Sequence, residues 1–437
     1  MPGSAASQLW RNWAGNQQAR PRRTATPASA EEVAATVRDA GREGLTVRMA
    51  GTGHSFTPVA VTDGVLLLPD GLRAIRSIDA DAGLVTVEAG CPLRTLNETL
   101  LRHGLSLANM GDIQEQTVAG AIQTGTHGTG RELGSIAAQV AGLELVLADA
   151  SVTTCSAEKD PALFAAARVG LGALGVLTAV TFRVVPAFLL QAREEPMRWD
   201  QVLHRLGELT AENEHFEFYW FPHTEGCLVK RNNRTDGGEH SLSVFRRWLD
   251  DEFLSNSVFG LTCRLGHAFP AAIRPVNRIA GKALGARTYT EPAYRVFTSP
   301  RRVRFKEQEY AIPREGLQAA LAELRGLFAR RDWRISFPIE VRVAPADDLW
   351  LSTAHGRDSA YIAIHVYHKC DHREYFRDVE AVMTAVAGRP HWGKMHTRDA
   401  GYLRGVYPRF GDFVALRDKL DPDRRFGNDY LTQVLGA

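Results

Sequence analysis

Three glycine-rich segments interrupt the first part of this chain and limit what it can fold into. They span residues 51–53, 120–130 and 170–175. Glycine permits positive φ and lets backbone N–H groups approach a ligand closely, and successive amides in such a turn can bind a diphosphate. Strand and helix patterns lie between the segments. Residues 1–186 are therefore predicted to form one mixed α+β domain with three special turns.

The first glycine segment follows an apolar strand pattern at 45–50 and leads directly into a histidine, His54. A diphosphate bound to the turn would lie beside this histidine. The dinucleotide fingerprint GxGxxG does not fit, because Phe56 stands at the third glycine position and Pro58 follows. Taken alone, the segment is also explained by an ordinary tight turn.

Helix and strand patterns surround all three segments. A capping box of Ser29 and Glu32 predicts a helix over 29–41. Residues 109–130 show neither helical nor strand period, and their small side chains indicate a long, ordered loop. The remaining elements expected in this half are a helix from Leu93 to His103-Gly104, strands at 65–68, 84–89 and 177–185, a hairpin of 143–147 with 151–155, and a helix opening at Asp160-Pro161.

The second half of the chain differs in composition and pattern, with more aromatic residues and longer strand patterns. Amphipathic helices are predicted at 314–330 and 374–387, and strands at 335–343 and 361–368. Residues 233–245 and 275–290 resemble loops. The pattern predicts an antiparallel sheet backed by helices, which forms a second domain after Pro186.

Charge and cysteine usage exclude several classes of protein. The net charge is +2 and the basic clusters at 230–234 and 301–304 are short, so solvated faces are expected and no nucleic-acid partner. The five cysteines are widely spread without a Cys-x-x-Cys pair, which is typical of a reducing compartment. No signal peptide or membrane-spanning run is apparent, and a cytoplasmic location is expected.

A charged pair on one predicted strand is the first candidate for substrate chemistry. Alternation places Glu340 and Arg342 on one face of the strand and Ile339, Val341 and Val343 on the other. A carboxylate beside a guanidinium can bind vicinal hydroxyls, with Arg donating and Glu accepting. The alternative is a solvated ion pair at a sheet surface, which contributes little to stability.

Two further polar positions follow near the C-terminus. The same alternation directs His365 and His368 to opposite faces, so they could not easily bind one ion, and no metal site is predicted. His365 is either a polar residue of a site-facing strand or a hydrogen-bonded core histidine. Lys394, in the turn 390–394, is either a directed cation or an exposed lysine. A serine hydrolase has little support, because no Gly-x-Ser-x-Gly occurs.

Together these pieces resemble the sugar-1,4-lactone oxidase branch of the vanillyl-alcohol-oxidase FAD family, which includes L-gulono-1,4-lactone and D-arabinono-1,4-lactone oxidases or dehydrogenases and alditol oxidases. The likeness covers nearly the whole chain. It implies an α+β fold with a two-part FAD-binding domain at 1–186 and 391–437 and an antiparallel-sheet cap domain at 187–390. The motifs that carry it are Gly51-Thr52-Gly53-His54-Ser55-Phe56, Gly125-Thr126-His127-Gly128-Thr129-Gly130, Leu171-Gly172-Ala173-Leu174-Gly175-Val176, Glu340-Val341-Arg342, Trp350-Leu351-Ser352 and His391-Trp392-Gly393-Lys394.

The resemblance also implies roles for single residues. His54 occupies the position that bonds covalently to the flavin in many members. The implied substrate-side set is Glu340, Arg342, His365 and Lys394. The implied cofactor-binding set is Gly51, Thr52, Gly53, His54, Ser55, Thr117, Gly120, Gly125, Thr126, His127, Gly128, Thr129, Gly175 and Val176.

The function implied is FAD-dependent oxidation of the 2-hydroxyl of an aldono-1,4-lactone by hydride transfer to flavin N5, with oxygen or another acceptor taking the electrons. L-gulono-1,4-lactone would then give an ascorbate precursor. Arg342 and Lys394 would stabilise developing negative charge, an ionised Glu340 would orient hydroxyls, and His365 is one possible base. Tyr367 replaces a threonine of the alditol oxidase pattern and favours a lactone. The alternatives are an alditol oxidase, a flavin-binding protein without turnover, and a carbohydrate-binding module without flavin.

Overall fold

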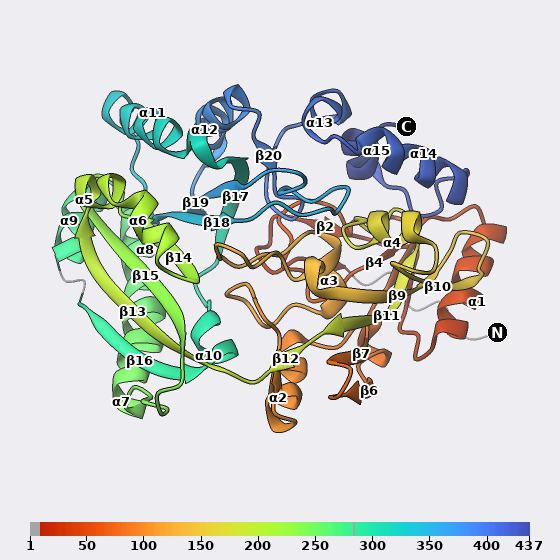
Figure 1. Cartoon of the computed structure of the whole chain (residues 1–437). Coiled ribbons are helices and arrows are strands. Elements are labelled where there is room, and N and C mark those ends of the chain that lie inside the picture. Colours follow the sequence, from red (N-terminus) through yellow and green to blue (C-terminus); the bar gives the residue numbers. More distant parts are fainter. Residues whose placement is uncertain (1–8, 283–284) are drawn as a thin grey trace.

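The computed structural model describes residues 9–282 and 285–437. Two β-rich halves lie side by side, with the N-terminal sheets and the C-terminal helices on one side and a large sheet on the other (Figure 1). Within the described ranges, no helix is both long and apolar enough to cross a membrane.

The first half begins with a small parallel sheet of order β3-β5-β4. Helix α1 (Ala30–Arg42) packs its apolar face, with Val33 and Val37 fully buried, against this sheet. The predicted cap is present, since the Glu32 N–H donates to Ser29 Oγ over 3.2 Å. The strands are β3 (Arg23–Ala25), β4 (Val47–Met49) and β5 (Val65–Leu67), preceded by the hairpin β1 (Trp10–Arg11) and β2 (Gln18–Ala19).

A five-stranded antiparallel sheet of order β10-β9-β11-β7-β6 completes this half, and it contains the predicted 143–155 hairpin. Its strands are β6 (Ile75–Asp79), β7 (Leu84–Glu88), β9 (Val140–Val146), β10 (Val152–Ser156) and β11 (Val176–Arg183). Helices α2 (Leu93–Arg102), α3 (Val118–Gln123) and α4 (Pro161–Ala167) pack on it, and β8 (Leu105–Ser106) pairs with β12 (Val185–Pro186).

The C-terminal helices return to the core of this first half. Leu403, Phe410 and Leu431 are fully or almost fully buried in the same apolar cluster as Val85 and Phe182. The chain therefore closes the N-terminal part with residues more than 200 positions away. These helices are α13 (Ala400–Val406), α14 (Phe410–Leu420) and α15 (Asp429–Leu435).

The second half is one antiparallel sheet of order β16-β13-β15-β14-β18-β19-β17-β20. Its apolar face, which includes Phe218, Val341 and Ile364, is covered by α5 (Trp199–His204), α6 (Leu206–Ala211), α11 (Leu317–Arg330) and α12 (Arg373–Ala385). The strands are β13 (Leu189–Arg198), β14 (His215–Trp220), β15 (Gly226–Thr235), β16 (Arg287–Pro292), β17 (Phe305–Pro313), β18 (Ile339–Ala344), β19 (Ser359–Tyr367) and β20 (Arg389–Pro390).

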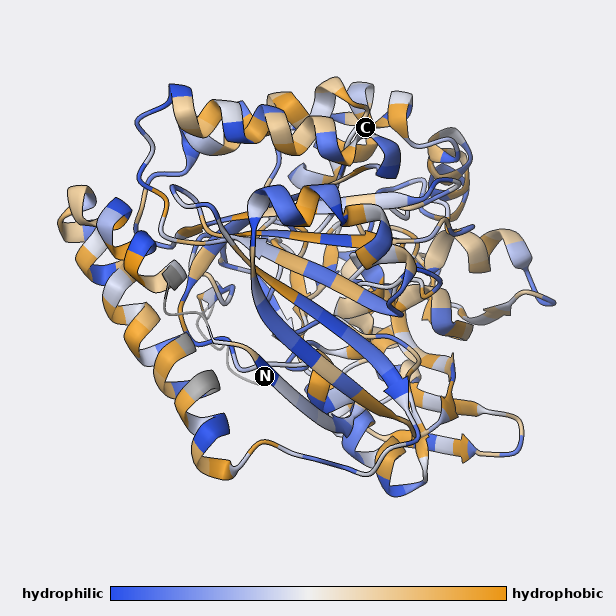
Figure 2. Ribbon diagram, turned by 60° about the vertical axis from the view of Figure 1, so that its left-hand side comes forward, coloured by the Kyte–Doolittle hydropathy of each residue, from blue (hydrophilic) through white to orange (hydrophobic). Residues whose placement is uncertain are grey.

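A helical arm lies between β15 and β16 in the chain. It consists of α7 (Val244–Arg247), a π-helical stretch (Trp248–Val258), α8 (Phe259–Ala268), a short turn (Pro270–Ala272) and α9 (Ile273–Lys282). Figure 2 shows the arm as a long helix along the outer edge. The small helix α10 (Ala293–Phe297) follows β16.

Three loop predictions were wrong in part. Residues 275–282 belong to α9 and 287–290 to β16; the Asn277 amide anchors α9 by donating to the carbonyls of Pro222 and Ile335. Residues 233–245 include the end of β15 and the start of α7. The segment 109–130 contains α3, capped by Thr117 and buried through small side chains. Tertiary packing, which local periodicity does not report, stabilises these elements.

Candidate active site

A cleft of about 890 Å³ runs along the carboxyl end of β4 and is lined by two of the three predicted glycine segments and by Gly120 of the third. It is formed by the turn 51–55, by α3 with its cap, and by the segment 171–177, with Phe426 from the C-terminal part. Segments that lie far apart in the sequence thus meet at one site. Nine residues of the predicted cofactor set line it: Gly51, Thr52, Gly53, His54, Ser55, Thr117, Gly120, Gly175 and Val176.

Glycine is required at this turn for two separate reasons. A Cβ on Gly51 would lie 2.3 Å from Thr117 Oγ1, so the turn can approach α3 only without a side chain. Gly53 has φ of +71°, a left-handed conformation that other residues rarely adopt. The backbone of the turn is therefore held close to the cleft, as a diphosphate site requires.

The buried Arg48 holds several segments of the cleft together, and no pattern in the sequence pointed to it. Its guanidinium donates to the carbonyl oxygens of Val59, Leu171, Gly172 and Phe426 over 2.6–2.9 Å. Burial lowers the pKa of Arg48 to about 10. One side chain thereby joins four segments, although the motif Val-Arg-Met shows only a strand.

His54 lies at the end of the cleft that faces the second half of the molecule. Its Nδ1 is 2.9 Å from Thr52 Oγ1, and its ring stacks on Trp13 with 5.7 Å between centroids. Burial, reinforced by the nearby Lys394, lowers the pKa of His54. The imidazole is thus held neutral and fixed in orientation.

The predicted residues 125–129 lie apart from the rest of the cofactor set. Gly125, Thr126 and His127 do not line the cleft, although Thr126 Oγ1 accepts from Gln116 of the cleft wall over 3.1 Å. Gly128 and Thr129 line a second, highly polar cavity of about 750 Å³ next to Arg342. This glycine segment therefore connects the cleft to the polar cavity.

The turn 391–394 joins the cleft to the large sheet. The Phe56 N–H donates to the Gly393 carbonyl over 2.7 Å, and the Thr57 hydroxyl donates to the Trp392 carbonyl over 2.8 Å. Lys394 projects from this turn and forms an ion pair with Glu307 of β17. The lysine is directed to the site and is not exposed to solvent as a free cation.

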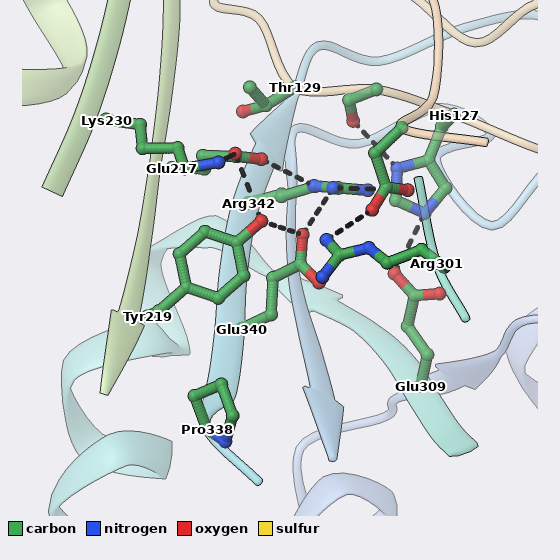
Figure 3. A network of polar contacts seen from close by, with 12 residues as sticks. His127, Thr129, Glu217, Tyr219, Lys230, Arg301, Glu309, Pro338, Glu340 and Arg342 are labelled. Atoms are coloured by element: carbon green, nitrogen blue, oxygen red, sulfur yellow. Dashed lines mark hydrogen bonds and ion pairs between the residues drawn. The ribbon is translucent and has the colours of Figure 1, made fainter. Parts of the chain in front are cut away.

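Glu340 and Arg342 lie in a network of buried charges (Figure 3). They form an ion pair with each other, and Arg342 Nε also donates to Glu217 over 2.8 Å. Asp112 lies 3.6 Å from Arg342 and accepts from Arg301 over 2.8 Å. Glu340 and Arg342 are only 7% and 9% exposed, which contradicts the alternative of a solvated surface pair.

The network extends across the sheet as a row of alternating charge. The strand register places Arg287, Glu194, Lys230, Glu217 and Arg342 directly opposite one another on five successive strands. The distances are 2.8 Å from Arg287 to Glu194 and 3.7 Å from Lys230 to Glu217. Directly opposite charges stabilise a strand pair. We refer to these five residues with Asp112, Glu340, Glu307 and Glu309 as the charged floor.

Among the carboxyls around Arg342, Glu340 is the one whose pKa is raised. Burial opposes ionisation of all three, but Arg342 with Arg301 holds the pKa of Asp112 well below its usual range, and Arg342 with Lys230 lowers that of Glu217. The pKa of Glu340 is raised, because burial and the two neighbouring carboxylates outweigh Arg342. The predicted ion pair with Arg342 is present, but it does not lower the pKa of Glu340, because Arg342 is shared among three carboxylates.

His365 lies on the same face of β19 as Tyr361 and Tyr367 and reaches the Lys394 pair. Its Nε2 is 3.4 Å from Glu307 Oε1, and its Nδ1 is 3.3 Å from the Pro338 carbonyl. Burial opposes the charge on Lys394, yet Glu307 raises its pKa overall, and Lys394 with His365 lowers that of Glu307. His365, Glu307 and Lys394 thus form one hydrogen-bonded group beside Glu340.

Among the described residues, one trio of potential metal ligands converges: His127, Glu309 and His391, all buried, have ligand atoms within 4.8 Å. The Gly393 N–H donates to His391 Nδ1 over 3.0 Å, which leaves the proton on Nε2 and disfavours metal binding there. His127 faces the Gly128 carbonyl over 2.8 Å and Glu309 over 3.0 Å. The trio therefore joins the glycine segment to β17 through hydrogen bonds.

FAD fits the residues of the cleft. The turn without side chains at Gly51 and Gly53 gives the close backbone approach that a diphosphate needs. The lining of the cleft offers backbone amides and hydroxyls in preference to charges.

Comparisons with known proteins agree with this geometry. The family described as D-arabinono-1,4-lactone oxidase matches residues 180–434, and that described as FAD binding domain matches residues 21–156. L-gulono-1,4-lactone dehydrogenase of Mycobacterium tuberculosis is 42% identical over 98% of this chain and 100% of its own length. L-gulonolactone oxidase of Bos taurus is 34% identical, and alditol oxidase of a Streptomyces species 32%, each over 97% of this chain and 98% of its own length.

Among solved structures, cholesterol oxidase from B. sterolicum superimposes with a TM-score of 0.83 at 17% identity, over 98% of this chain and 96% of that one. This likeness concerns the fold alone and confirms the predicted α+β class, with a two-part FAD-binding domain of the vanillyl-alcohol-oxidase type and an antiparallel-sheet cap. The chain belongs to the D-arabinono-1,4-lactone oxidase family, the sugar-lactone branch of the FAD-linked oxidoreductases that act on CH–OH donors.

Proposed function

We propose that this enzyme oxidises the 2-hydroxyl of an aldono-1,4-lactone, of which L-gulono-1,4-lactone is the first choice. The observation that supports this most is the position of Lys394. Its turn packs directly on the cleft turn at Phe56 and Thr57, while its ammonium reaches the charged floor at Glu307. A substrate above the floor would therefore lie next to a cofactor in the cleft.

In this proposal the glycine turn at 51–55, Thr117, Gly120, Gly175 and Val176 bind FAD, and residues 125–129 separate it from the polar cavity. FAD supplies the two-electron acceptor for oxidation of the alcohol carbon. The protein contributes orientation and electrostatics. The substrate names of relatives, including a gulonolactone dehydrogenase at 42% identity, support the lactone.

Each residue of the proposed catalytic set has a separate task. Arg342, fixed by Glu217 and Asp112, donates to substrate hydroxyl oxygens. Glu340 accepts the proton of the reacting hydroxyl, because its raised pKa brings it closer to the working pH than its neighbours. Lys394 stabilises negative charge that develops at the reacting oxygen, and His365 orients the substrate beside Glu307.

We further propose that FAD is attached covalently at His54. Burial keeps the imidazole neutral, and Thr52 and Trp13 fix its orientation. The absorbance of the purified protein before and after acid precipitation tests this. Yellow colour is expected in the pellet, and His54→Ala should move it to the supernatant. Yellow colour in the supernatant of the unchanged protein would refute covalent attachment but not the binding of FAD.

An alditol oxidase is the second candidate, since one such relative is 32% identical. Tyr367 argues for the lactone: it is buried with Phe305 and Phe337, where a smaller residue would leave room for a longer polyol. Anaerobic bleaching of the flavin by a panel of lactones and alditols decides between them. Bleaching by L-gulono-1,4-lactone but not by alditols is expected, and the reverse would overturn the assignment.

We also propose that oxygen or another redox acceptor takes the electrons, and that the enzyme works in the cytoplasm. Five free cysteines, four of them buried, support a reducing compartment.

A further inference from the structure

The helical arm at 244–282 concentrates the exposed apolar surface of the molecule. Of the ten exposed large apolar side chains in the described residues, nine lie between Val244 and Ile279. Phe269 and Ile279 are 67% and 70% exposed. Single exposed apolar residues need no explanation, but a contiguous group of this size marks a binding surface.

The spacing arranges part of this surface as a stripe. Leu261 and Leu265 are four residues apart along α8, so they lie on one side of the helix, and Phe269 follows as the residue that caps its C-terminal end. Phe245 and Trp248, three residues apart, continue the exposed surface at the start of the arm. Figure 2 shows apolar segments repeated along the outer edge of this helix. We call Leu261, Leu265 and Phe269 with Phe245 and Trp248 the apolar stripe.

The inner side of the arm packs firmly on the rest of the protein. The exposure of the stripe therefore does not result from a detached arm. Cys263 is buried, and the Phe259 ring lies 4.8 Å from Phe337. Asn277 donates to two carbonyls of the sheet half. Phe337 in turn stacks on His365 at 6.0 Å. The arm thus connects the stripe to the wall of the active site.

The charge of the arm indicates which kind of partner binds it. Residues 244–282 contain six basic and three acidic residues, and the three acidic residues all lie at 250–252. The part at 259–282 contains Arg264, Arg274, Arg278 and Lys282 and no Asp or Glu. Arg264 of α8 and Arg278 of α9 are both exposed. A symmetric dimer through this surface would bring the same arginines of both copies into one interface, which is unfavourable. An anionic bilayer surface matches both the cations and the apolar side chains.

We propose that the arm docks this enzyme on the surface of an anionic lipid bilayer, with the apolar stripe inserted at the headgroup level and Arg264 and Arg278 on the lipid phosphates. A helix with Trp, Phe and Leu on one face and arginines beside it lies in the interface without spanning the membrane. Docking leaves the large sheet and its cavity outside the bilayer.

The test is sedimentation of the full chain, loaded with its flavin, with vesicles of phosphatidylcholine alone or with added phosphatidylglycerol. Binding to the anionic vesicles is expected. Leu265→Ser combined with Phe269→Ser should reduce it about tenfold, and Arg264→Gln or Arg278→Gln about fivefold each. Val152→Ser, an exposed apolar residue outside the arm, is the matched control and should change nothing.

A second measurement follows the arm directly. Trp248 is half exposed, so its fluorescence should shift to shorter wavelength with anionic vesicles, and Trp248→Phe should remove that shift. Circular dichroism of each variant verifies its fold independently of activity. Absence of vesicle binding, or binding that the Leu265 and Phe269 substitutions leave unchanged, would overturn the proposal. A dimer in light scattering that these substitutions dissociate, without vesicle binding, would overturn it in favour of a second copy.

Discussion

The cofactor cleft and the charged floor face each other, but they are built by opposite means. The cleft uses backbone: Gly51 and Gly53 remove side chains, and Arg48 collects carbonyl oxygens beneath. The floor uses side chains in pairs of opposite charge from successive strands. Shape therefore defines the cleft, whereas the floor is defined by charge. Because buried ion pairs add little net stability, the floor is explained by chemistry and not by folding.

The largest effect is expected from Arg342→Met. The change leaves Glu217, Glu340 and Asp112 without their shared cation, so substrate orientation and charge stabilisation are lost together. Turnover should fall by about 1000-fold while flavin absorbance per protein stays the same. Arg373→Met, at an exposed ion pair with Asp371, is the control. Loss of flavin in Arg342→Met would show that flavin binding in the cleft depends on the charged floor.

Gly51→Val tests whether flavin binding in the cleft depends on a turn without a side chain. The new side chain would collide with Thr117 Oγ1, only 2.3 Å from the Cβ position. Noncovalent flavin affinity, measured by fluorescence titration in a His54→Ala background, should fall by about 100-fold, or roughly 2.7 kcal/mol. Gly207→Ala, at a helical position with open space, should bind normally. Normal binding by Gly51→Val would refute the close-approach argument.

Arg48→Lys tests the role of the buried guanidinium beneath the cleft. Lysine keeps the charge but cannot reach four carbonyl groups at once, so some acceptors lose their donor. The free energy of unfolding, from urea titration, should fall by about 2 kcal/mol. Arg38→Lys, on the exposed face of α1, should leave it unchanged. An equal loss in both variants would mean that Arg48 has no special role.

The smallest effect concerns His391, which lies between the two regions. Burial lowers its pKa from 6.5 to about 3. The unfolded chain therefore binds a proton between these values and the folded protein does not, so stability falls as the pH drops below 6.5. From pH 7.5 to 5.5 this histidine should cost about 1.4 kcal/mol. His391→Asn should reduce the slope of unfolding free energy against pH, and an unchanged slope would contradict the depressed pKa.

Local patterns predicted the parts of the fold that depend on local chemistry. The capping box gave the start of α1, and period-2 alternation placed Glu340 and Arg342 on one face of β18. The same reasoning missed α3 and most of α9, which lie within segments predicted as loops. Their stability comes from Asn277 and from buried small side chains, which are tertiary contacts.

The sequence alone was enough to predict the glycine turns, the sheet patterns and the family, because positive φ, alternation and short motifs are properties of neighbouring residues. Which charges meet depends on the tertiary structure. Arg48 binds a carbonyl 378 positions away at Phe426, and Arg342 meets Glu217 across 125 residues. The protonation of Glu340 depends on this arrangement, because burial and neighbouring charge set a pKa, and both arise only when distant strands pair.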